Sequence, residues 1–439
     1  MPSNNMKKRI AIIGSGISGL TSAWLLAPTH EVTLFEAGNN CGGHSHTIDV
    51  DFAGEKISID TGFMVYNYQG YPELTKFFNY LDIPTKPADM SFSVSLRDGA
   101  FEWSVYSLST IFADRRNIFR LSFYRFLGEI IRFNRLGRKT LGEVISKKES
   151  YSQSIDVFLN KHSFSEAFRQ QYIYPMASLI WSAPRGVIRD FPIMMVLEFF
   201  SKHNLLQTST GLTWRSVVGG SRTYVDLVIK EITEKHGAIV LTKAPVSSVS
   251  RTAEGVTVTS VRGEESFDSV VFATHADTTL QLLQDASPEE HEILRDFVYQ
   301  KNYVVAHSDT SLMPKRKRAW AAWNFCDVID GNNEDEMSLT YNMNILNGIP
   351  ARYPVFVTIN PVRPIADSLV HATFRYDHPL QNLCSVDAQK RIHSIQGIQN
   401  TYYCGAYFGY GFHEDGFCAG KEVAEKFGVI PPWETNPSV

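Results

Sequence analysis

The sequence predicts an α/β fold, in which a Rossmann-like domain with a parallel sheet binds a dinucleotide and carries inserted domains. Three observations support this prediction. A glycine-rich turn joins a short apolar strand to a helix within residues 10–26. A second apolar strand, residues 32–35, ends in Glu36 about twenty residues beyond the glycines, as the dinucleotide-binding fingerprint requires. The length of 439 residues is sufficient for two or more domains.

The three glycines of the turn have different expected roles. Gly14 permits the tight turn, Gly16 lets the backbone approach a pyrophosphate, and Gly19 lets the helix pack closely on the strand. The N-terminus of the helix offers unpaired N–H groups to the anion. Glu36 is expected to accept hydrogen bonds from an adenosine ribose. A glycine-rich turn between packed elements would explain the glycines but not the acid, so we interpret residues 10–36 as a nucleotide site.

Composition excludes several other classes of protein. Charged residues make up 20% of the chain and the formal net charge is −4, so nothing points to nucleic acid as a partner. The five cysteines lack paired CxxC spacing, which favours a reducing compartment over disulfides or zinc. No apolar run reaches the roughly 18 residues of a membrane span, and no signal peptide precedes the first strand. We therefore expect a cytoplasmic protein, with contact at the inner membrane surface left open.

The later elements follow from periodicity. Residues 55–67 alternate like a strand, and residues 70–83 have the pattern of a helix. Residues 104–200 are mostly helical in pattern. Strand signals return at 238–261, where "AEG" separates two alternating runs, and at 269–277, which is predicted as a buried strand.

The nucleotide signals lie at both ends and in the middle of the chain, which implies a discontinuous domain. We assign this cofactor domain to three segments, residues 1–70, 210–280 and 395–430. A helix-rich substrate or lid region, 71–209, and a mixed β/α substrate domain, 281–394, lie between them. Residues 431–439 are interpreted as a tail.

Five separated segments between residues 9 and 427 resemble the FAD-dependent amine oxidase, phytoene desaturase and protoporphyrinogen oxidase superfamily. Within it, the chain is most similar to predicted NAD/FAD-binding proteins that resemble the N-terminal flavoprotein region of plant cyclopropane fatty-acid synthases. The resemblance implies a GR2-type Rossmann domain and FAD rather than NAD, since a simple NAD dehydrogenase needs neither a second glycine pair nor a C-terminal flavin segment. No match to a covalent-flavin cysteine segment is present, so non-covalent FAD is expected.

The resemblance also assigns cofactor contacts residue by residue. A glycine pair follows the acid, "IDTGF" lies near the isoalloxazine, "VVGGSRTYVDL" starts a helix, and "KAPVSSV" contacts adenine through the backbone. The last segment, "YYCGAYFGYGFHEDGF", is expected to start a helix near Gly416 whose positive end faces the flavin C2 oxygen. The assigned residues are Gly42, Gly43, Asp60, Gly62, Val246, Gly405, Asp415 and Gly416.

Two positions depart from the family pattern. His44 stands where many relatives have arginine, and a neutral imidazole is a weaker and pH-dependent phosphate partner than guanidinium. Asp415 replaces the usual, longer glutamate. His44 and His46 alternate on one strand face, but no third ligand accompanies them, so we expect no metal site. The consecutive His413, Glu414 and Asp415 are interpreted as loop residues at the flavin.

FAD would supply the redox chemistry, so the protein must place a substrate C–H bond against the flavin. The aromatic residues that we expect to wall the substrate pocket are Trp320, Trp323, Phe325, Tyr341, Tyr407, Tyr410 and Phe412, with a packed core as the alternative for each ring. Lys301 lies roughly where many amine oxidases hold a water near flavin N5, with a solvated strand-end lysine as the alternative. Aromatic walls suit amines by cation–π attraction and acyl chains by dispersion.

Residues 113–139 contain eight arginines or lysines and only two acids. Aromatic and aliphatic residues recur there at helical spacing, which predicts an apolar stripe formed by Phe119, Phe123, Phe126, Ile130 and Phe133. Such a helix could rest on anionic lipid. The alternative is a helix buried on all sides, because apolar residues also occupy the far face, at Leu121, Tyr124 and Ile131.

Three functional hypotheses follow. The first is an FAD-dependent oxidoreductase that transfers hydride from a hydrophobic substrate, in particular a fatty acyl chain, by desaturation or isomerisation. The second is an amine oxidase. The third is a non-catalytic flavin-binding partner of a lipid methyltransferase. The sequence sets neither the exact substrate, nor the electron acceptor, nor the oligomeric state.

Overall fold

The structure is a computed structural model that describes residues 7–105, 107–147, 153–207, 212–327 and 337–435. Predictions made for the other residues, such as residues 436–439 of the tail, lie outside the described part of the chain. Its first unit is a parallel five-stranded sheet with the strand order β10-β2-β1-β14-β20. Apolar residues of neighbouring strands are in register, as Ile12 is with Leu34 and Val271. The strands are β1 (Arg9–Ile13), β2 (Glu31–Phe35), β10 (Ile239–Leu241), β14 (Ser269–Phe272) and β20 (Thr401–Tyr403).

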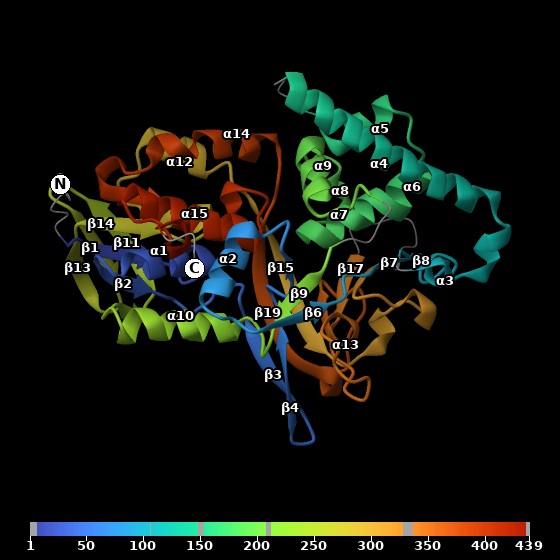
Figure 1. Ribbon diagram of the computed structural model, residues 1–439, viewed down its shortest axis with the longest axis horizontal. Coiled ribbons are helices and arrows are strands. Elements are labelled where there is room, and N and C mark those ends of the chain that lie inside the picture. Colours follow the sequence, from blue (N-terminus) through green and yellow to red (C-terminus); the bar gives the residue numbers. More distant parts are fainter. Residues whose placement is uncertain (1–6, 106, 148–152, 208–211, 328–336, 436–439) are drawn as a thin grey trace.

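Three helices pack on this sheet: α1 (Ile17–Leu26), α10 (Arg222–Glu234) and α15 (His413–Lys426) (Figure 1). Helices α1 and α15 approach closely because Gly420 faces α1, where a Cβ would lie 2.4 Å from the Ser18 carbonyl oxygen. An antiparallel sheet of β11 (Val246–Arg251), β12 (Val256–Ser260) and β13 (Gly263–Phe267) lies at the same end of the molecule. The fold class predicted from the sequence is confirmed: an α/β fold in which a Rossmann-like domain carries an inserted mixed α+β domain and a helical subdomain.

The second sheet has seven strands, in the order β19-β15-β18-β17-β16-β7-β8. Its members are β7 (Phe92–Leu96), β8 (Phe101–Ser104), β15 (Tyr299–His307), β16 (Trp323–Asp327), β17 (Met337–Asn342), β18 (Phe356–Ile359) and β19 (Val370–Pro379). Strands β7 and β8 fall inside the segment 71–209 that was predicted as helix-rich, but β7 pairs in parallel with β16. The sheet therefore joins two segments that the sequence assignment kept apart.

The helical region covers one end of this sheet, at the opposite end of the molecule from β1 (Figure 1). It contains α3 (Leu108–Ile111), the 3₁₀ helix η1 (Arg115–Phe119), α4 (Leu121–Lys147), α5 (Ile155–Lys161), α6 (Glu166–Phe168), α7 (Tyr174–Trp181), α8 (Arg185–Ile188) and α9 (Ile193–Lys202). The predicted membrane-facing stripe is wrong for most of its residues. Phe123, Phe126 and Phe133 are at most 3% exposed and pack in the core with Trp103.

Shorter elements connect the two sheets. A hairpin of β3 (Thr47–Phe52) and β4 (Glu55–Asp60) follows the nucleotide turn, and β9 (Trp214–Val217) pairs with β5 (Tyr66–Asn67) and β6 (Thr85–Ala88). The remaining helices are α2 (Pro72–Tyr80), α11 (Ala276–Leu282), α12 (Pro288–Leu294), α13 (Met343–Leu346), α14 (Leu383–Arg391) and α16 (Pro432–Thr435). Among the described residues, no helix combines the length and the apolar composition needed to cross a membrane.

Candidate functional site

A cavity of about 510 Å³ runs between the nucleotide turn and the seven-stranded sheet. One end is lined by the β1–α1 turn, the tip of β2 and the start of β11. The other end is lined mainly by aromatic side chains from α7, α9, β16, β17 and the segment before α15. One continuous site can therefore hold an elongated cofactor and a substrate together.

The glycines of the turn have the geometry expected for phosphate binding. Gly14 has φ +100°, and a Cβ there would lie 2.8 Å from the Ala273 carbonyl oxygen. A Cβ on Gly19 would lie 1.9 Å from the Gly14 oxygen, so α1 touches the turn directly. Gly16, by contrast, faces open space, because a Cβ there would meet no atom within 4 Å. The backbone beside Gly16 is therefore free to approach a ligand at the N-terminus of α1.

The second glycine pair completes this cradle. Gly42 has φ +120°, and its N–H donates to the Ser15 carbonyl oxygen at 3.0 Å. Gly43 lies against Gly16, because a Cβ on Gly43 would be 3.0 Å from the Gly16 Cα. Gly62 is equally constrained, since a Cβ there would fall 2.2 Å from the His44 carbonyl oxygen. Side chains are thus excluded where the β1–α1 turn meets the segment that contains the second glycine pair.

Glu36 lines the cavity at the tip of β2, where an adenosine ribose was expected. Its carboxylate accepts hydrogen bonds from the Ser15 N–H (3.1 Å), the Ser15 hydroxyl (2.5 Å) and the Gly38 N–H (2.6 Å). Val246 lines the same end of the cavity, at the start of β11. The sequence analysis did not single out Ser15, which orients Glu36 and also receives the Gly42 N–H on its side chain (3.2 Å).

His44 lies in a group of rings rather than in solvent. Its ring centroid is 5.0 Å from that of Tyr376, 5.4 Å from that of His378 and 6.2 Å from that of His275. Its Nε2 atom is buried and has no hydrogen-bond partner among the described residues. Burial holds the pKa of His44 well below its ordinary value, and the neighbouring His378 lowers it further. His44 is thus a neutral imidazole in the cavity lining, with one buried nitrogen that has no partner in the described part of the chain.

This histidine group should make the protein sensitive to acid. Burial lowers the pKa of His378 to about 4 and that of His413 to about 3, against an ordinary value of 6.5. As pH falls below 6.5 the unfolded chain binds protons that the folded chain does not, so stability is lost toward pH 3. Each such histidine should remove about 1.4 kcal/mol of unfolding free energy per pH unit within its window.

Urea unfolding of His378→Asn at several pH values tests this, because the asparagine oxygen replaces the Nδ1 atom that lies 2.8 Å from the Asn302 amide nitrogen. We expect a shallower loss of stability between pH 6.5 and 4 than in the wild type. The wild-type profile alone is not sufficient, because burial raises the pKa of Asp415 to about 6 and this group makes the folded state more stable as pH falls. The difference between wild type and variant isolates the contribution of His378. Parallel pH profiles for the two proteins would contradict the prediction.

Asp60 does not line the cavity. Its buried carboxylate accepts from the Ser221 N–H (2.8 Å), the Ser221 hydroxyl (2.7 Å) and the Thr47 hydroxyl (2.6 Å). Burial raises its pKa. The expected position beside the isoalloxazine is corrected to a structural one: Asp60 fixes the glycine turn of Gly219 and Gly220 at the start of α10.

The C-terminal segment also differs from expectation. Helix α15 starts at His413, not near Gly416, and it includes the three residues that were interpreted as a loop. Asp415 caps it by accepting from the Phe412 N–H at 2.9 Å. Gly416 faces α1 instead of the cavity, because a Cβ there would lie 2.7 Å from an Ile17 methyl carbon. The N-terminus of the helix still points into the cavity, because Phe412 and His413 line it.

His413, which the sequence analysis placed in a loop at the flavin, lines the cavity from the first turn of α15. Its Nε2 atom lies 2.7 Å from the Ser45 hydroxyl and 3.2 Å from the Tyr224 hydroxyl. Its ring stacks on Phe63 at a centroid distance of 3.7 Å. The only signal available was its place just before Asp415 in the C-terminal motif. Neighbouring Glu414 turns away and accepts the Glu73 and Leu74 N–H groups of α2.

Among the four candidate catalytic residues, Trp323, Tyr341 and Tyr410 line the cavity and Lys301 does not. Trp323 and Tyr341 meet edge to face at 5.4 Å and form one wall. The Tyr410 hydroxyl donates to Glu198 at 2.6 Å. Lys301 is exposed on β15, outside the lining, so it corresponds to the solvated alternative. Of the other candidate walls, Tyr407 and Phe412 line the cavity, whereas Trp320 and Phe325 lie outside its lining. Aromatic lining residues that the sequence analysis did not name include Trp181, Phe199 and Trp214.

Gly405 lines the middle of the cavity, before η8 (Ala406–Phe408). Together, the residues present fit a flavin dinucleotide: open backbone at Gly16, a carboxylate at the tip of β2, and a helix N-terminus at the far end. Two residues of the lining, His44 and Trp323, each have a buried nitrogen, Nε2 and Nε1 respectively, without a hydrogen-bond partner among the described residues. No group of three or more metal-ligating side chains occurs in the described part of the chain.

Comparison with known proteins identifies the family. The model of the flavin containing amine oxidoreductase family matches residues 17–348, so the chain belongs to this family and is an FAD-dependent oxidoreductase. A tryptophan 2-monooxygenase of Allorhizobium ampelinum is 33% identical over 121 residues. That match covers 24% of this chain and only 16% of the length of the relative.

Solved structures share the whole fold at low sequence identity. A putative protoporphyrinogen oxidase from Exiguobacterium sp. 255-15 aligns with a TM-score of 0.67 and 16% identity, over 95% of this chain and 98% of that one. A fatty acid isomerase from P. acnes that produces CLA aligns with a TM-score of 0.67 and 14% identity, over 96% and 99%. These likenesses establish the fold, and the same fold serves different chemistries.

Proposed function

We propose that this oxidoreductase transfers hydride from a C–H bond of a hydrophobic substrate, in particular a fatty acyl chain, and works as a desaturase or an isomerase. The observation that carries the proposal is the lining of the cavity beyond the nucleotide end. Its walls are aromatic and aliphatic, with Met64, Ile180, Trp181, Phe199, Trp323 and Tyr341 among them. The acids among the described lining residues are Glu36, at the ribose end, and Asp377, beside His378.

Such walls favour an uncharged chain. A buried ammonium group needs a nearby carboxylate, whereas methylene groups gain from dispersion and burial alone. Burial also raises the pKa of Tyr341 to about 12, so this phenol keeps its proton at neutral pH. The sequence resemblance to the flavoprotein region of plant cyclopropane fatty-acid synthases supports the same substrate class.

The chemistry divides between cofactor and protein. FAD supplies a hydride acceptor, and in an isomerisation it also supplies the donor that returns the hydride. The protein contributes apolar walls that hold the chain against the flavin end of the cavity and exclude water. The hydroxyl of Tyr410 is held by Glu198, so its ring is fixed at the edge of the cavity.

Anaerobic titration of the FAD-loaded protein tests the proposal, with absorbance and product analysis recorded together. The probes are oleic acid, a dioleoyl phospholipid and benzylamine. We expect an acyl probe to bleach the flavin, or to be isomerised without net bleaching, while benzylamine has no effect. Bleaching by benzylamine alone would establish the amine oxidase instead. Inertness toward all three, in a protein that photoreduces normally, would favour the non-catalytic flavin-binding partner.

Trp323→Leu tests the aromatic wall. We expect kcat/KM for the acyl substrate to fall about tenfold, equivalent to about 1.4 kcal/mol, because the wall loses contact area against the chain. FAD content should stay unchanged. The matched control is Trp320→Leu, since Trp320 lies outside the cavity lining, three residues away. Equal effects of the two substitutions would show that Trp323 has only a packing role.

A further inference from the structure

Helices α3 and α4 lie at the end of the molecule opposite β1 (Figure 1), and exposed apolar side chains lie on α3, on η1 and on α4. Phe119 is 89% exposed, Leu108 77% and Leu121 67%. Ile118, Tyr124 and Ile131 are also exposed. We call these six residues the η1 patch. Large apolar side chains that are almost fully exposed and close together on consecutive segments commonly mark an interaction surface.

The η1 patch is formed by three short segments that contact one another. The Arg115 guanidinium donates to the Ser109 hydroxyl at 3.2 Å, which ties η1 to α3. The Tyr124 hydroxyl donates to the Ile118 carbonyl oxygen at 3.0 Å, which ties α4 to η1. The opposite face of α4 is occupied by the buried phenylalanines of the core. The exposed side chains are therefore those that the core does not use.

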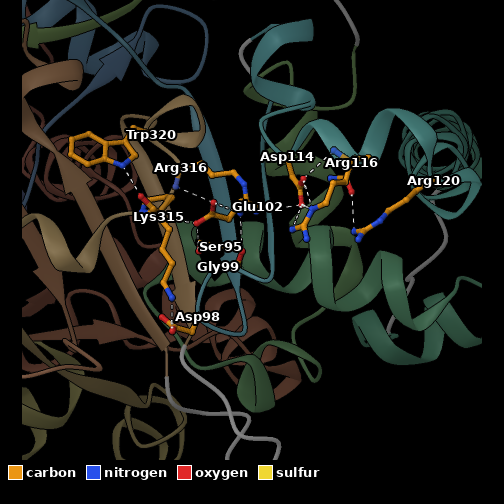
Figure 2. A network of polar contacts seen from close by, with 12 residues as sticks. Ser95, Asp98, Gly99, Glu102, Asp114, Arg116, Arg120, Lys315, Arg316 and Trp320 are labelled. Atoms are coloured by element: carbon orange, nitrogen blue, oxygen red, sulfur yellow. Dashed lines mark hydrogen bonds and ion pairs between the residues drawn. The ribbon is translucent and has the colours of Figure 1, made fainter.

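A network of polar contacts connects η1 to the seven-stranded sheet, as Figure 2 shows. The buried Asp114 carboxylate accepts from the Arg116 guanidinium at 2.7 Å and lies 3.5 Å from Arg316. Arg316 in turn pairs with the buried Glu102 of β8 at 2.7 Å. The segment between β8 and α4 is thus anchored to the seven-stranded sheet, so Phe119 and Leu121 project from a fixed support.

Charge identifies the kind of partner. Arg115, Arg120 and Arg125 are exposed around the patch, and none forms an ion pair within the described part of the chain. Arg132 and Arg135 continue the same exposed face of α4. Both acids in residues 113–139 are already paired, the buried Asp114 with Arg116 and Glu129 with Arg132 at 3.2 Å, although the whole chain carries a net charge of −4. The positive charge is therefore concentrated here.

We propose that the η1 patch docks on the surface of an anionic phospholipid bilayer, with Phe119 and Leu121 in the acyl boundary and the arginines at the headgroups. A second copy of the chain fits less well, because a two-fold contact through this surface would bring the unpaired arginines of both copies together. The proposal is independent of turnover, since docking is measured without substrate chemistry.

Flotation of the FAD-loaded protein with vesicles tests this, using phosphatidylglycerol mixed with phosphatidylcholine against phosphatidylcholine alone. We expect binding to the anionic vesicles only, weakening as salt rises because the Debye length shortens to about 10 Å at 0.1 M. Two double variants should each reduce the bound fraction at least tenfold: Phe119→Ser with Leu121→Ser, and Arg120→Gln with Arg125→Gln.

Matched controls come from exposed residues elsewhere: Val261→Ser with Ile398→Ser, which are 68% and 54% exposed, and Arg262→Gln with Arg375→Gln. These should bind vesicles like the wild type, and all variants should keep their FAD. Absence of wild-type binding at low salt, or equal losses in the controls, would overturn the proposal. So would a dimer in sedimentation that the Phe119 and Leu121 variant abolishes, because the patch would then belong to a second copy.

Discussion

Replacing Gly16 with alanine is expected to leave the protein folded and to weaken FAD binding roughly ten- to a hundredfold. The fold should tolerate the methyl group because the Cβ position meets no atom within 4 Å, and φ at Gly16 is −64°, an ordinary value for alanine. The same methyl group would stand where the pyrophosphate approaches the backbone. Inserting a methyl group into a close contact costs about 1–3 kcal/mol, which gives the expected range.

The control is Gly142→Ala, at an exposed position of α4 where a Cβ also meets nothing within 4 Å. Its FAD affinity should equal that of the wild type, and its helix should gain up to about 1 kcal/mol from the better propensity of alanine. Flavin fluorescence during titration of the apoprotein measures both affinities. Unchanged affinity in Gly16→Ala would mean that the pyrophosphate lies elsewhere in the cavity.

The nucleotide turn could be predicted from the sequence because its determinants are local. Gly14, Gly16, Gly19 and Glu36 lie within one strand-turn-helix-strand unit. Close contacts inside that unit or with the residue after β14 require glycine at Gly14 and Gly19, whereas Gly16 leaves the backbone open to a ligand. The spacing of these residues in the sequence was therefore sufficient to predict the nucleotide turn.

The direction in which α4 faces could not be predicted in the same way. Two apolar sets lie on its opposite sides, one with Phe123 and Phe126 and one with Leu121 and Tyr124. Periodicity detects both sets but does not say which one meets a core. That choice depends on Phe101 and Trp103 of β8, and the pairing of β7 with β16 more than two hundred residues later brings this hairpin into the sheet.

Most of the site is also long-range. His44, His275 and His378 come from three distant segments, and no local pattern indicates that their rings converge. Asp60 illustrates the opposite error: a family motif placed it beside the flavin, whereas it lies outside the cavity lining and its Oδ1 atom accepts hydrogen bonds from Ser221 and Thr47. Motifs identify which residues matter, but only the packed structure shows what each side chain contacts.

The polar network beneath the η1 patch should have a large effect on stability. The Glu102 side chain is 0% exposed and accepts four hydrogen bonds, from the Ser95 hydroxyl, the Lys315 N–H, and the N–H and guanidinium of Arg316. Glu102→Gln keeps the shape but turns an amide N–H₂ toward two of these donors. Breaking a buried ion pair costs about 3–5 kcal/mol, and the lower end applies because the Arg316 side chain is 30% exposed.

Asp98→Asn is the matched control in the same hairpin. Asp98 pairs with Lys315 and Arg363 at the surface, where the three side chains are 36–57% exposed, and exposed pairs contribute only about 0–1 kcal/mol. Asparagine also tolerates the φ of 52° at this position. We expect urea unfolding to show a loss of about 3 kcal/mol in unfolding free energy for Glu102→Gln and almost none for Asp98→Asn.

Amide hydrogen exchange should accelerate in β8 and η1 in the Glu102→Gln variant only. The reason is that Arg316 pairs with both Glu102 of β8 and Asp114 before η1, so the loss of Glu102 weakens the link between the two elements. Similar losses in both variants would mean that burial does not distinguish the two pairs, and that the segment under Phe119 is held by packing alone.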